Sequence, residues 1–449
     1  MFRKLLLVFS VLVFANANAQ LQSSAFLGLA PVDSAPGIAV EVGGLHPDGT
    51  GAAIGLLTGD TLKALNGVSV RDFAHLLEQL VAINEGTKLE LSVVREGKEV
   101  RLEGVAKSRP RESGQGYSVD YGQFTWKNNH IRTISYYPDT PREDKAAVMF
   151  IQGYTCDSID YGMSPNMTLS QLLASYAQAG FSVFKMEKPG VGDSKGPLNC
   201  ADYDFDTENA AFVAGLQHFS SDKRINPDNM FVFGHSLGVL HAAKIAEQGL
   251  VKGVMGYGGV LKPWFEYLQD IYTKQAVQYF GVSSKQSIAN LKTVNPFLDQ
   301  WLNTDKSWQH LLQDKTLNDA MRSGLIPING ESVFDRHFSF FRSLNRYDFT
   351  GMWSNSLSHA LMMHGTLDIQ AIDGSWATQI AALVDATPKS SGHSISFPDT
   401  DHALMRYPNK QSLLAAMRNN TYRPEEPLEH YNPEIAKASL EWMQSILTP

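Results

Sequence analysis

The chain has 449 residues, of which 43% are hydrophobic and 19% are charged, with 36 Gly and 20 Pro. This composition excludes a disordered, collagen-like or disulfide-scaffold protein, and the length predicts roughly two or three domains with sizeable cores. The net charge of −8 excludes the strongly basic surface of a nucleic-acid-binding protein, so nucleic acid is not an expected partner.

The N-terminus has the pattern of a secretory signal peptide. Two basic residues, Arg3 and Lys4, precede the apolar run 5–14, and small residues at 17–19 form a cleavage site. A membrane anchor is the alternative, but this run is about half of the roughly 20 residues that cross a bilayer. We expect residues 1–19 to be removed, no integral membrane segment afterwards, and a secreted or periplasmic protein.

The chain has two cysteines, Cys156 and Cys200. In an exported protein such a pair favours a disulfide, and both residues follow apolar, strand-like runs whose ends can be neighbours. We expect the two to be bonded, with two buried free thiols as the alternative.

The run 107–115 contains no core-forming residue and is predicted to be a linker. It separates a small module, residues 23–106, from a larger part, residues 116–449. In the module we expect a helix at 72–81 and a hairpin with strands 89–94 and 100–105, which together indicate a small α+β domain.

The segments Gly59-Asp60-Thr61-Leu62 and Asn66-Gly67-Val68 are similar to those of a PDZ domain of exported bacterial proteases. The resemblance covers about 80 residues and implies a carboxylate-binding loop for a peptide C-terminus. That loop would consist of Phe26, Leu27, Gly28 and Leu29. Glycine there lets consecutive N–H groups turn toward a carboxylate. A PDZ-shaped spacer without a ligand is the alternative.

In the larger part, apolar strand-like runs alternate with helix-like segments, the pattern of a mostly parallel sheet with helices on both faces. The expected strands are 146–151, 181–186, 230–233, 251–257 and 361–363, and the expected helices are 169–179, 209–219 and 239–246. Residues 262–347 break this alternation and are rich in aromatic side chains. We expect them to form a helical lid over the carboxyl edge of the sheet.

A candidate nucleophile follows the strand 230–233. Gly234-His235-Ser236-Leu237-Gly238 leads into a helix-like segment, and strand, Gly-x-Ser-x-Gly, helix is the pattern of a nucleophile elbow. The turn is so tight that its flanking residues must be small, and it exposes the Ser236 hydroxyl at the sheet edge.

A serine hydroxyl needs a base to take its proton and an acid to orient that base. Asp368 and His402 each follow an apolar strand-like run, in the chain order serine, acid, histidine that accompanies this elbow. We therefore predict a triad of Ser236, His402 and Asp368. The competing acids are Asp373, Asp399 and Asp401, and the competing histidines are His235, His364 and His393.

Residues 116–449 as a whole resemble an α/β-hydrolase. The Gly-rich run 187–194 is similar to that family's loop after its fourth strand, and the position of the lid also matches. An oxyanion hole is then expected from the N–H groups of Leu237 and Tyr154, although Gln152 stands where the family commonly has His. The chain looks most like secreted bacterial esterases of short-acyl type, while the same core also carries proline-directed aminopeptidases.

Two sets of charged residues are interpreted as structural rather than functional. The run 206–208 is interpreted as the N-terminal cap of the following helix. In the lid, Arg336, His337 and Arg342 could bind a substrate carboxylate, but a solvated helix face is the favoured interpretation.

The sequence thus predicts a secreted serine hydrolase that cleaves a small-molecule carboxylic ester through an acyl-enzyme, without cofactor or metal. A serine peptidase of the same fold is the first alternative, with the PDZ-like module presenting peptide C-termini. An adaptor with a vestigial hydrolase fold is the second.

Overall fold

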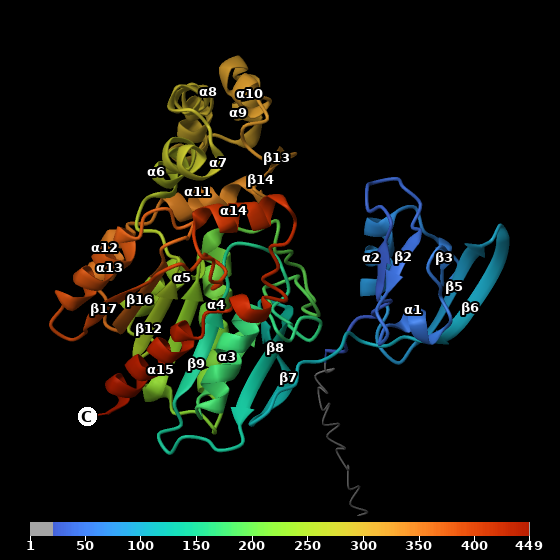
Figure 1. Ribbon diagram of the computed structural model, residues 1–449, viewed down its shortest axis with the longest axis horizontal. Helices are drawn as coiled ribbons and strands as arrows, with labels where there is room; N and C mark the ends of the chain where they lie inside the picture. Colours follow the sequence, from blue (N-terminus) through green and yellow to red (C-terminus); the bar gives the residue numbers. More distant parts are fainter. Residues whose placement is uncertain (1–20, 449) are drawn as a thin grey trace, which may run out of the picture.

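The structure, a computed structural model, describes residues 21–448 (Figure 1). The predicted signal peptide, residues 1–19, lies outside the described residues. Within the described part of the chain, no helix is both long and apolar enough to cross a bilayer.

The main body, residues 116–448, is built on one eight-stranded sheet with the strand order β17-β16-β12-β11-β9-β10-β8-β7 (Figure 1). The parallel strands are β9 (Ala147–Ile151), β10 (Ser182–Met186), β11 (Met230–His235), β12 (Gly253–Tyr257), β16 (His359–Gly365) and β17 (Gly392–Phe397). Five of them contain an apolar run of the sequence, whereas the edge strand β17 is mostly polar and only partly buried. Because all six are parallel, their carboxyl ends meet at one edge of the sheet.

Helices cover both faces of this sheet. On one face lie α3 (Thr168–Gln178) and α15 (Glu434–Leu447); on the other lie α4 (Phe205–Ser220), α5 (Gly238–Glu247), α12 (Phe349–Ser354) and α13 (Ser375–Asp385). Residues of one strand alternate between the two cores: Val148 and Phe150 pack on the α3 side, Met149 and Ile151 on the α5 side. The predicted fold class, a mostly parallel α/β sheet with helices on both faces, is confirmed.

The sequence did not predict the first two strands, β7 (Tyr117–Trp126) and β8 (Asn129–Pro138). They form an antiparallel hairpin whose two turn residues, Lys127 and Asn128, have φ of +45° and +61°. Such turns usually carry Asn-Gly or Asp-Gly, and because this turn has no glycine, the sequence pattern did not predict the hairpin.

Residues 262–347 lie above the carboxyl ends of the parallel strands (Figure 1). Their helices are α6 (Trp264–Asp270), α7 (Ala276–Phe280), α8 (Ser284–Leu302), α9 (Trp308–Gln313), α10 (Lys315–Met321) and α11 (Phe338–Asn345). A small sheet of β13 (Ile328–Asn329), β14 (Ser332–Val333) and β15 (Arg336–His337) interrupts them. The segment is therefore largely helical, as expected, with a three-stranded insertion that was not expected.

The N-terminal module, residues 21–106, has a separate apolar core. It contains the sheets β1-β2 and β4-β3-β5-β6. Its elements are β1 (Leu29–Pro31), β2 (Val42–Leu45), α1 (Thr50–Ala53), β3 (Thr61–Leu65), β4 (Val68–Ser69), α2 (Phe73–Val81), β5 (Lys88–Arg95) and β6 (Lys98–Val105). The expected helix and hairpin correspond to α2 and β5-β6.

The run 107–115 has neither helix nor strand, yet one of its residues is anchored in the main body. The Glu112 carboxylate accepts hydrogen bonds from Lys185 Nζ at 2.6 and 2.7 Å and from the Tyr161 N–H at 2.7 Å. Both charged side chains are buried. A segment without core-forming residues is thus held to the core by a buried ion pair.

Candidate active site

Ser236 lies on a strained turn between β11 and α5. Its φ is +57°, in the left-handed region that residues other than glycine rarely adopt. A Cβ at Gly234 would lie 2.6 Å from the Gly238 carbonyl oxygen, and a Cβ at Gly238 would lie 2.2 Å from the Ile151 carbonyl oxygen. These approaches explain physically why glycine stands on both sides of the serine.

Asp368 and His402 form a hydrogen-bonded pair beside this turn. Asp368 Oδ2 lies 2.8 Å from His402 Nδ1, and Asp368 Oδ1 accepts from the N–H groups of Gln370 and Ala371, each at 2.8 Å. A Cβ at Gly258 would lie 2.7 Å from His402 Cε1 and 2.9 Å from Asp368 Oδ2. Both carboxylate oxygens are therefore fixed, and the pair is packed against backbone.

Burial and the contact between Asp368 and His402 shift the pKa values of these two groups in opposite directions. Burial by itself lowers the pKa of His402, but the charge of Asp368 and its hydrogen bond outweigh this, and the pKa is raised above its usual value. Burial by itself raises the pKa of Asp368, but His402 outweighs it and that pKa is lowered. The carboxylate stays ionised and stabilises a protonated His402.

The competing acids have other partners. Asp401 is buried and accepts from two backbone N–H groups of its own loop and from the Tyr422 hydroxyl. Burial raises the pKa of Asp401 to about 6. Asp373 accepts from the Ser375 N–H at 3.0 Å, and Asp399 is exposed. Of the four candidate acids, Asp368 is the one bonded to His402.

Among the described residues, none of the competing histidines is hydrogen-bonded to Asp368, although His235 packs beside His402 with ring centroids 4.9 Å apart. His235 Nε2 is 2.8 Å from the His402 carbonyl oxygen, and burial lowers the pKa of His235 to about 4, so the ring is neutral and supports the His402 backbone. Neither His364 nor His393 is among the residues that line the cavity described next.

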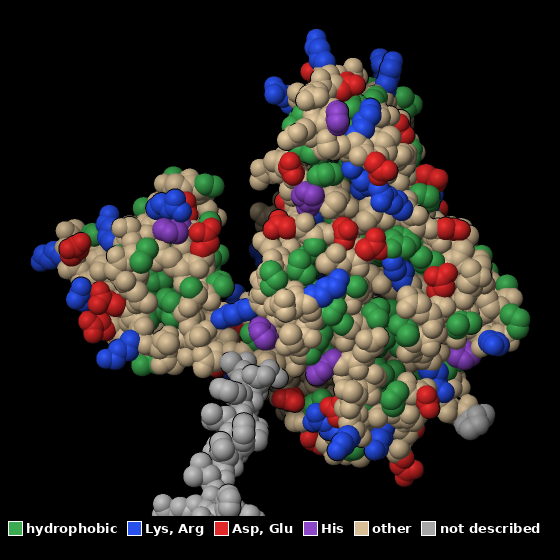
Figure 2. All heavy atoms as spheres, turned by 180° about the vertical axis from the view of Figure 1, so that it is seen from behind, with side chains coloured by type: hydrophobic (Ala, Val, Ile, Leu, Met, Phe, Trp, Pro, Cys, Tyr) green, Lys and Arg blue, Asp and Glu red, His purple; other side chains and the backbone are tan. Residues whose placement is uncertain are grey.

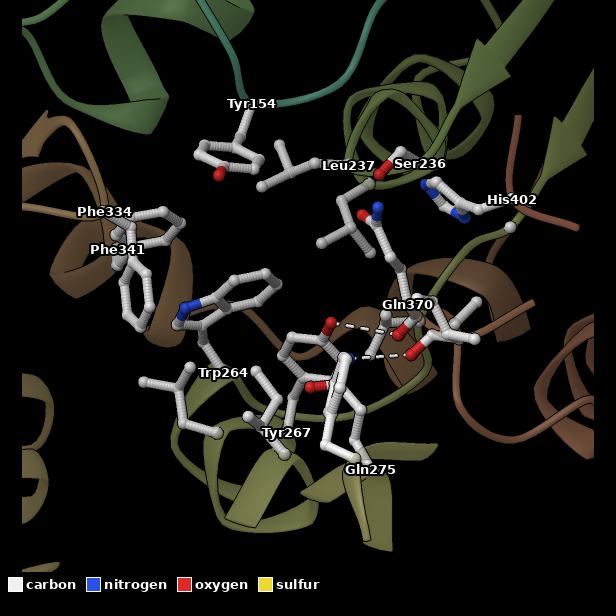
Figure 3. A pocket seen from close by; sticks show the side chains of 18 residues that line it. Tyr154, Ser236, Leu237, Trp264, Tyr267, Gln275, Phe334, Phe341, Gln370 and His402 are labelled. Carbon is white, nitrogen blue, oxygen red and sulfur yellow. Dashed lines mark hydrogen bonds between the residues drawn. The ribbon is translucent and has the colours of Figure 1, made fainter. Parts of the chain in front are cut away.

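Ser236 and His402 lie on the wall of a cavity of about 330 Å³ beneath the lid (Figure 3). The other walls are mainly apolar and aromatic, formed by Tyr154, Leu237, Leu240, Val260, Trp264, Tyr267, Leu268, Ile271, Phe280, Phe334, Phe341, Ile369 and Ala371. Among the described residues, no hydrogen bond joins the Ser236 hydroxyl to His402. The two side chains are neighbours on the wall.

Two glutamines add amide groups to this wall, beside the hydroxyl groups of Tyr154 and Tyr267 and the indole N–H of Trp264. The Gln275 amide is engaged, because it donates to the Ile369 carbonyl at 2.7 Å. The Gln370 side chain extends toward Ser236 (Figure 3). No Asp, Glu, Lys or Arg lines the cavity, and the described residues contain no group of three or more His, Cys, Asp or Glu placed to hold a metal ion.

The backbone at Gly153 and Tyr154 lies against the nucleophile. A Cβ at Gly153 would lie 3.1 Å from Ser236 Cβ and 3.4 Å from its Oγ. In the described part of the chain, the N–H groups of Tyr154 and Leu237 donate to no other residue. Both predicted oxyanion donors are thus beside the elbow and unengaged, and their role stays a prediction.

A buried charged cluster next to this loop was missed by the sequence analysis. It consists of Lys188, Glu208, His241 and Arg336, whose side chains are 0 to 1% exposed. Glu208 Oε1 lies 3.0 Å from Lys188 Nζ and 3.2 Å from His241 Nε2, and Glu208 Oε2 lies 2.8 Å from Arg336 Nη2. Its members come from four separate segments, so no local pattern could reveal it.

Two interpretations of the sequence are corrected by these contacts. Glu208 is in the first turn of α4 but does not cap it, because Asp204 accepts from the Thr207 N–H at 2.8 Å. The lid arginines are not a solvated face: Arg336 is buried on Glu208, and Arg342 donates to the Trp301 carbonyl at 2.6 Å.

Cys156 and Cys200 are joined by a disulfide, with their Cα atoms 5.8 Å apart. The bond connects the loop after β9, which carries Gly153 and Tyr154, to the loop before α4. It thereby ties the segment of Gly153 and Tyr154 to a second part of the main body.

The loop Phe26, Leu27, Gly28 and Leu29 lines a second cavity, of about 690 Å³, and not the cavity of Ser236 and His402. Residues of the main body line this second cavity as well, and Figure 2 shows the hollow between the module and the main body. Gly28 has a φ of +74°. Helix α2 forms one wall, and the main-body loop 190–194 lines the cavity as well.

No protein-family model and no curated protein matches the chain. Solved structures are similar to it. One is the α/β hydrolase GrgF from Penicillium sp. sh18, with 13% identity over 74% of this chain and 100% of that chain and a TM-score of 0.44. The proline iminopeptidase of Mycobacterium smegmatis has 12% identity, coverages of 73% and 98%, and a TM-score of 0.42.

The esterase domain of a Rhodothermus marinus protein has 16% identity over 68% of this chain and 98% of that chain, with a TM-score of 0.37. At these identities the similarity concerns the fold and says nothing of the reaction.

Proposed function

We propose that the protein is a serine hydrolase that cleaves carboxylic esters through an acyl-enzyme. Ser236 attacks the ester carbonyl carbon while His402 takes its proton, and Asp368 orients and stabilises the resulting imidazolium. The N–H groups of Tyr154 and Leu237 bind the oxyanion of the tetrahedral intermediate. His402 returns the proton to the leaving alcohol, and water then releases the acid by the same steps.

The observation that carries this proposal is the 2.8 Å contact between His402 Nδ1 and Asp368 Oδ2 beside a Ser236 with a φ of +57°. A buried carboxylate bonded to one ring nitrogen leaves the other nitrogen as the base. Ser236, on its strained turn, lines the same cavity wall as His402, so the serine and the base face one cavity.

The lining of the cavity favours an ester over an aminopeptidase substrate. A carboxylate is the natural partner of a free α-ammonium group, and among the described residues no Asp or Glu lines this cavity. The aromatic and aliphatic walls instead favour an uncharged small molecule. A secreted or periplasmic location fits the predicted signal peptide and the disulfide.

The proposal is tested by a substrate panel with wild type and Ser236→Ala. We expect hydrolysis of p-nitrophenyl esters, no hydrolysis of aminoacyl p-nitroanilides, and loss of the esterase activity in Ser236→Ala. Faster turnover of the anilides would establish the peptidase instead. Inactivity toward both classes would favour the adaptor.

We also propose that the N-terminal module binds a peptide C-terminus; the support is that the loop 26–29 and α2 both line the cavity between the module and the main body. We expect a peptide with a free C-terminal carboxylate to bind more tightly than its amidated form, measured by fluorescence anisotropy. Equal affinity of the two forms would mean that the loop does not recognise a carboxylate.

A further inference from the structure

The carbonyl oxygens of the oxyanion loop are held by buried cations. Lys188 Nζ donates to the Gly153 carbonyl at 2.6 Å and to the Thr155 carbonyl at 2.9 Å. Arg336 Nη1 donates to the Tyr154 carbonyl at 2.6 Å. Three successive peptide groups of the segment that lies against Ser236 are therefore bonded to charged side chains.

The bond to Gly153 fixes the direction of the proposed oxyanion donor. The Gly153 carbonyl and the Tyr154 N–H belong to one peptide group, which is planar and trans, so that oxygen and hydrogen point in opposite directions. By holding the oxygen on one side, Lys188 directs the N–H to the other. The Tyr154 N–H is unengaged there by any described residue.

Glu208 holds the two cations in place. Its two oxygens contact Lys188 and Arg336 separately, and all three side chains are buried. Burial by itself raises the pKa of Glu208, but Lys188 and Arg336 outweigh it and the carboxyl stays ionised. Burial lowers the pKa of Lys188 to about 8, which still leaves it mainly protonated at neutral pH.

Arg336 connects this arrangement to the lid. It lies in β15, and it bridges Glu208 of α4 and the Tyr154 carbonyl, which are far from it in the sequence. The next residue, His337, donates its N–H to the Ala201 carbonyl, next to the Cys200 half of the disulfide. The lid and the oxyanion loop are therefore held by the same buried charges.

We propose that Lys188 and Arg336, held by Glu208, are positioning residues that aim the Tyr154 N–H at the reacting oxygen and make its alignment depend on the lid. This inference rests on the proposed serine hydrolase function. These side chains do not touch the substrate; they act on the orientation of a peptide group in the transition state.

Arg336 can be tested against a matched control, Arg342. Both are buried lid arginines, but Arg342 donates to the Trp301 carbonyl, and among the described residues no hydrogen bond joins it to the oxyanion loop. The full mature chain is prepared as wild type, Arg336→Met and Arg342→Met. A second pair, Arg336→Lys and Arg342→Lys, keeps the charge and is less disruptive, but the one nitrogen of a shorter lysine does not reproduce the separate Nη1 and Nη2 contacts that Arg336 makes with Tyr154 and Glu208.

The readouts are kcat and KM on a p-nitrophenyl ester, inhibition by an alkyl boronic acid that forms a tetrahedral adduct on serine, and thermal unfolding. For Arg336→Met we expect kcat to fall roughly 10- to 100-fold with KM within about twofold, since loss of an oxyanion donor costs 10² to 10³. Boronate affinity should fall in parallel. Arg336→Lys should lose less, and both Arg342 variants should keep kcat within about twofold.

Equal effects of the Arg336 and Arg342 substitutions on kcat would overturn the inference, because both would then act through lid stability alone. If Arg336→Met does not fold, unchanged kcat and boronate affinity in Arg336→Lys would overturn it equally. Failure of the proposed function is distinguishable: it appears as a wild-type chain without Ser236-dependent hydrolysis.

Discussion

Asp368 is the residue whose role can be separated best from that of its neighbours. Three other aspartates lie close to it in sequence or near His402, but Asp368 contacts the imidazole. We expect Ser236→Ala, His402→Ala and Asp368→Asn each to lower kcat by about 10³ or more, because triad members act as a unit. Asp399→Asn, at an exposed position, is the control in steady-state assays. A comparable loss in that variant would contradict the assignment of the acid.

The raised pKa of His402 predicts the pH dependence of the reaction. The base must be neutral to accept the Ser236 proton, so activity is lost as pH falls through the His402 pKa. Because Asp368 raises that pKa, we expect the acid limb of kcat/KM to have its midpoint above the usual value of about 6.5.

In Asp368→Asn the carboxylate charge is absent, and the midpoint measured on the residual activity should move to lower pH. An unchanged midpoint in this variant would show that another group controls the titration.

At the scale of elements, the sequence predicted those features that residues close together in the chain determine. The apolar runs predicted the central parallel strands, because strands buried on both faces are continuously apolar. The glycines around Ser236 predicted the elbow, because short-range sterics determine so tight a turn. The hairpin β7-β8 was missed, since its turn residues, Lys127 and Asn128, take positive φ without a glycine. The sequence analysis expected Arg336 on a solvated face and Glu208 in a helix cap. It missed their ion pair because the two residues lie 128 positions apart and the burial of each charge depends on the other.

The disulfide joins two loops of the main body, and its cysteines are 44 residues apart in the sequence. A loop of this size corresponds to about 4 kcal/mol of stabilisation in the chain-entropy model. We expect denatured, unreduced protein to show no free thiols, and reduced protein to show two. The double variant Cys156→Ser/Cys200→Ser should lower the free energy of unfolding by up to that amount. Two titratable thiols before reduction would refute the bond.

At the scale of the whole molecule, a few polar contacts connect the N-terminal module to the main body. Arg132 Nη2 donates to the Leu21 carbonyl at 2.9 Å, and the Ser24 N–H donates to Asp193 at 2.9 Å. Among the described residues, those that line the Ser236 cavity all belong to the main body. We therefore predict that the main body hydrolyses esters without the module.

We accordingly expect residues 108–449, which retain Glu112 and its ion pair with Lys185, to hydrolyse a short p-nitrophenyl ester. Its kcat/KM should lie within about tenfold of the full mature chain, or about 1.4 kcal/mol of transition-state stabilisation. Cooperative thermal unfolding of the shortened chain is the control for folding. A folded but inactive fragment would mean that the module completes the site.

The central claim, that Ser236 is an activated nucleophile, is tested most directly by mass spectrometry of the intact chain after treatment with a fluorophosphonate. The account predicts one covalent adduct, mapped to Ser236 in the peptide digest, absent from Ser236→Ala and much slower in His402→Ala. A wild-type chain that stays unmodified, or an adduct on any other residue, would contradict it.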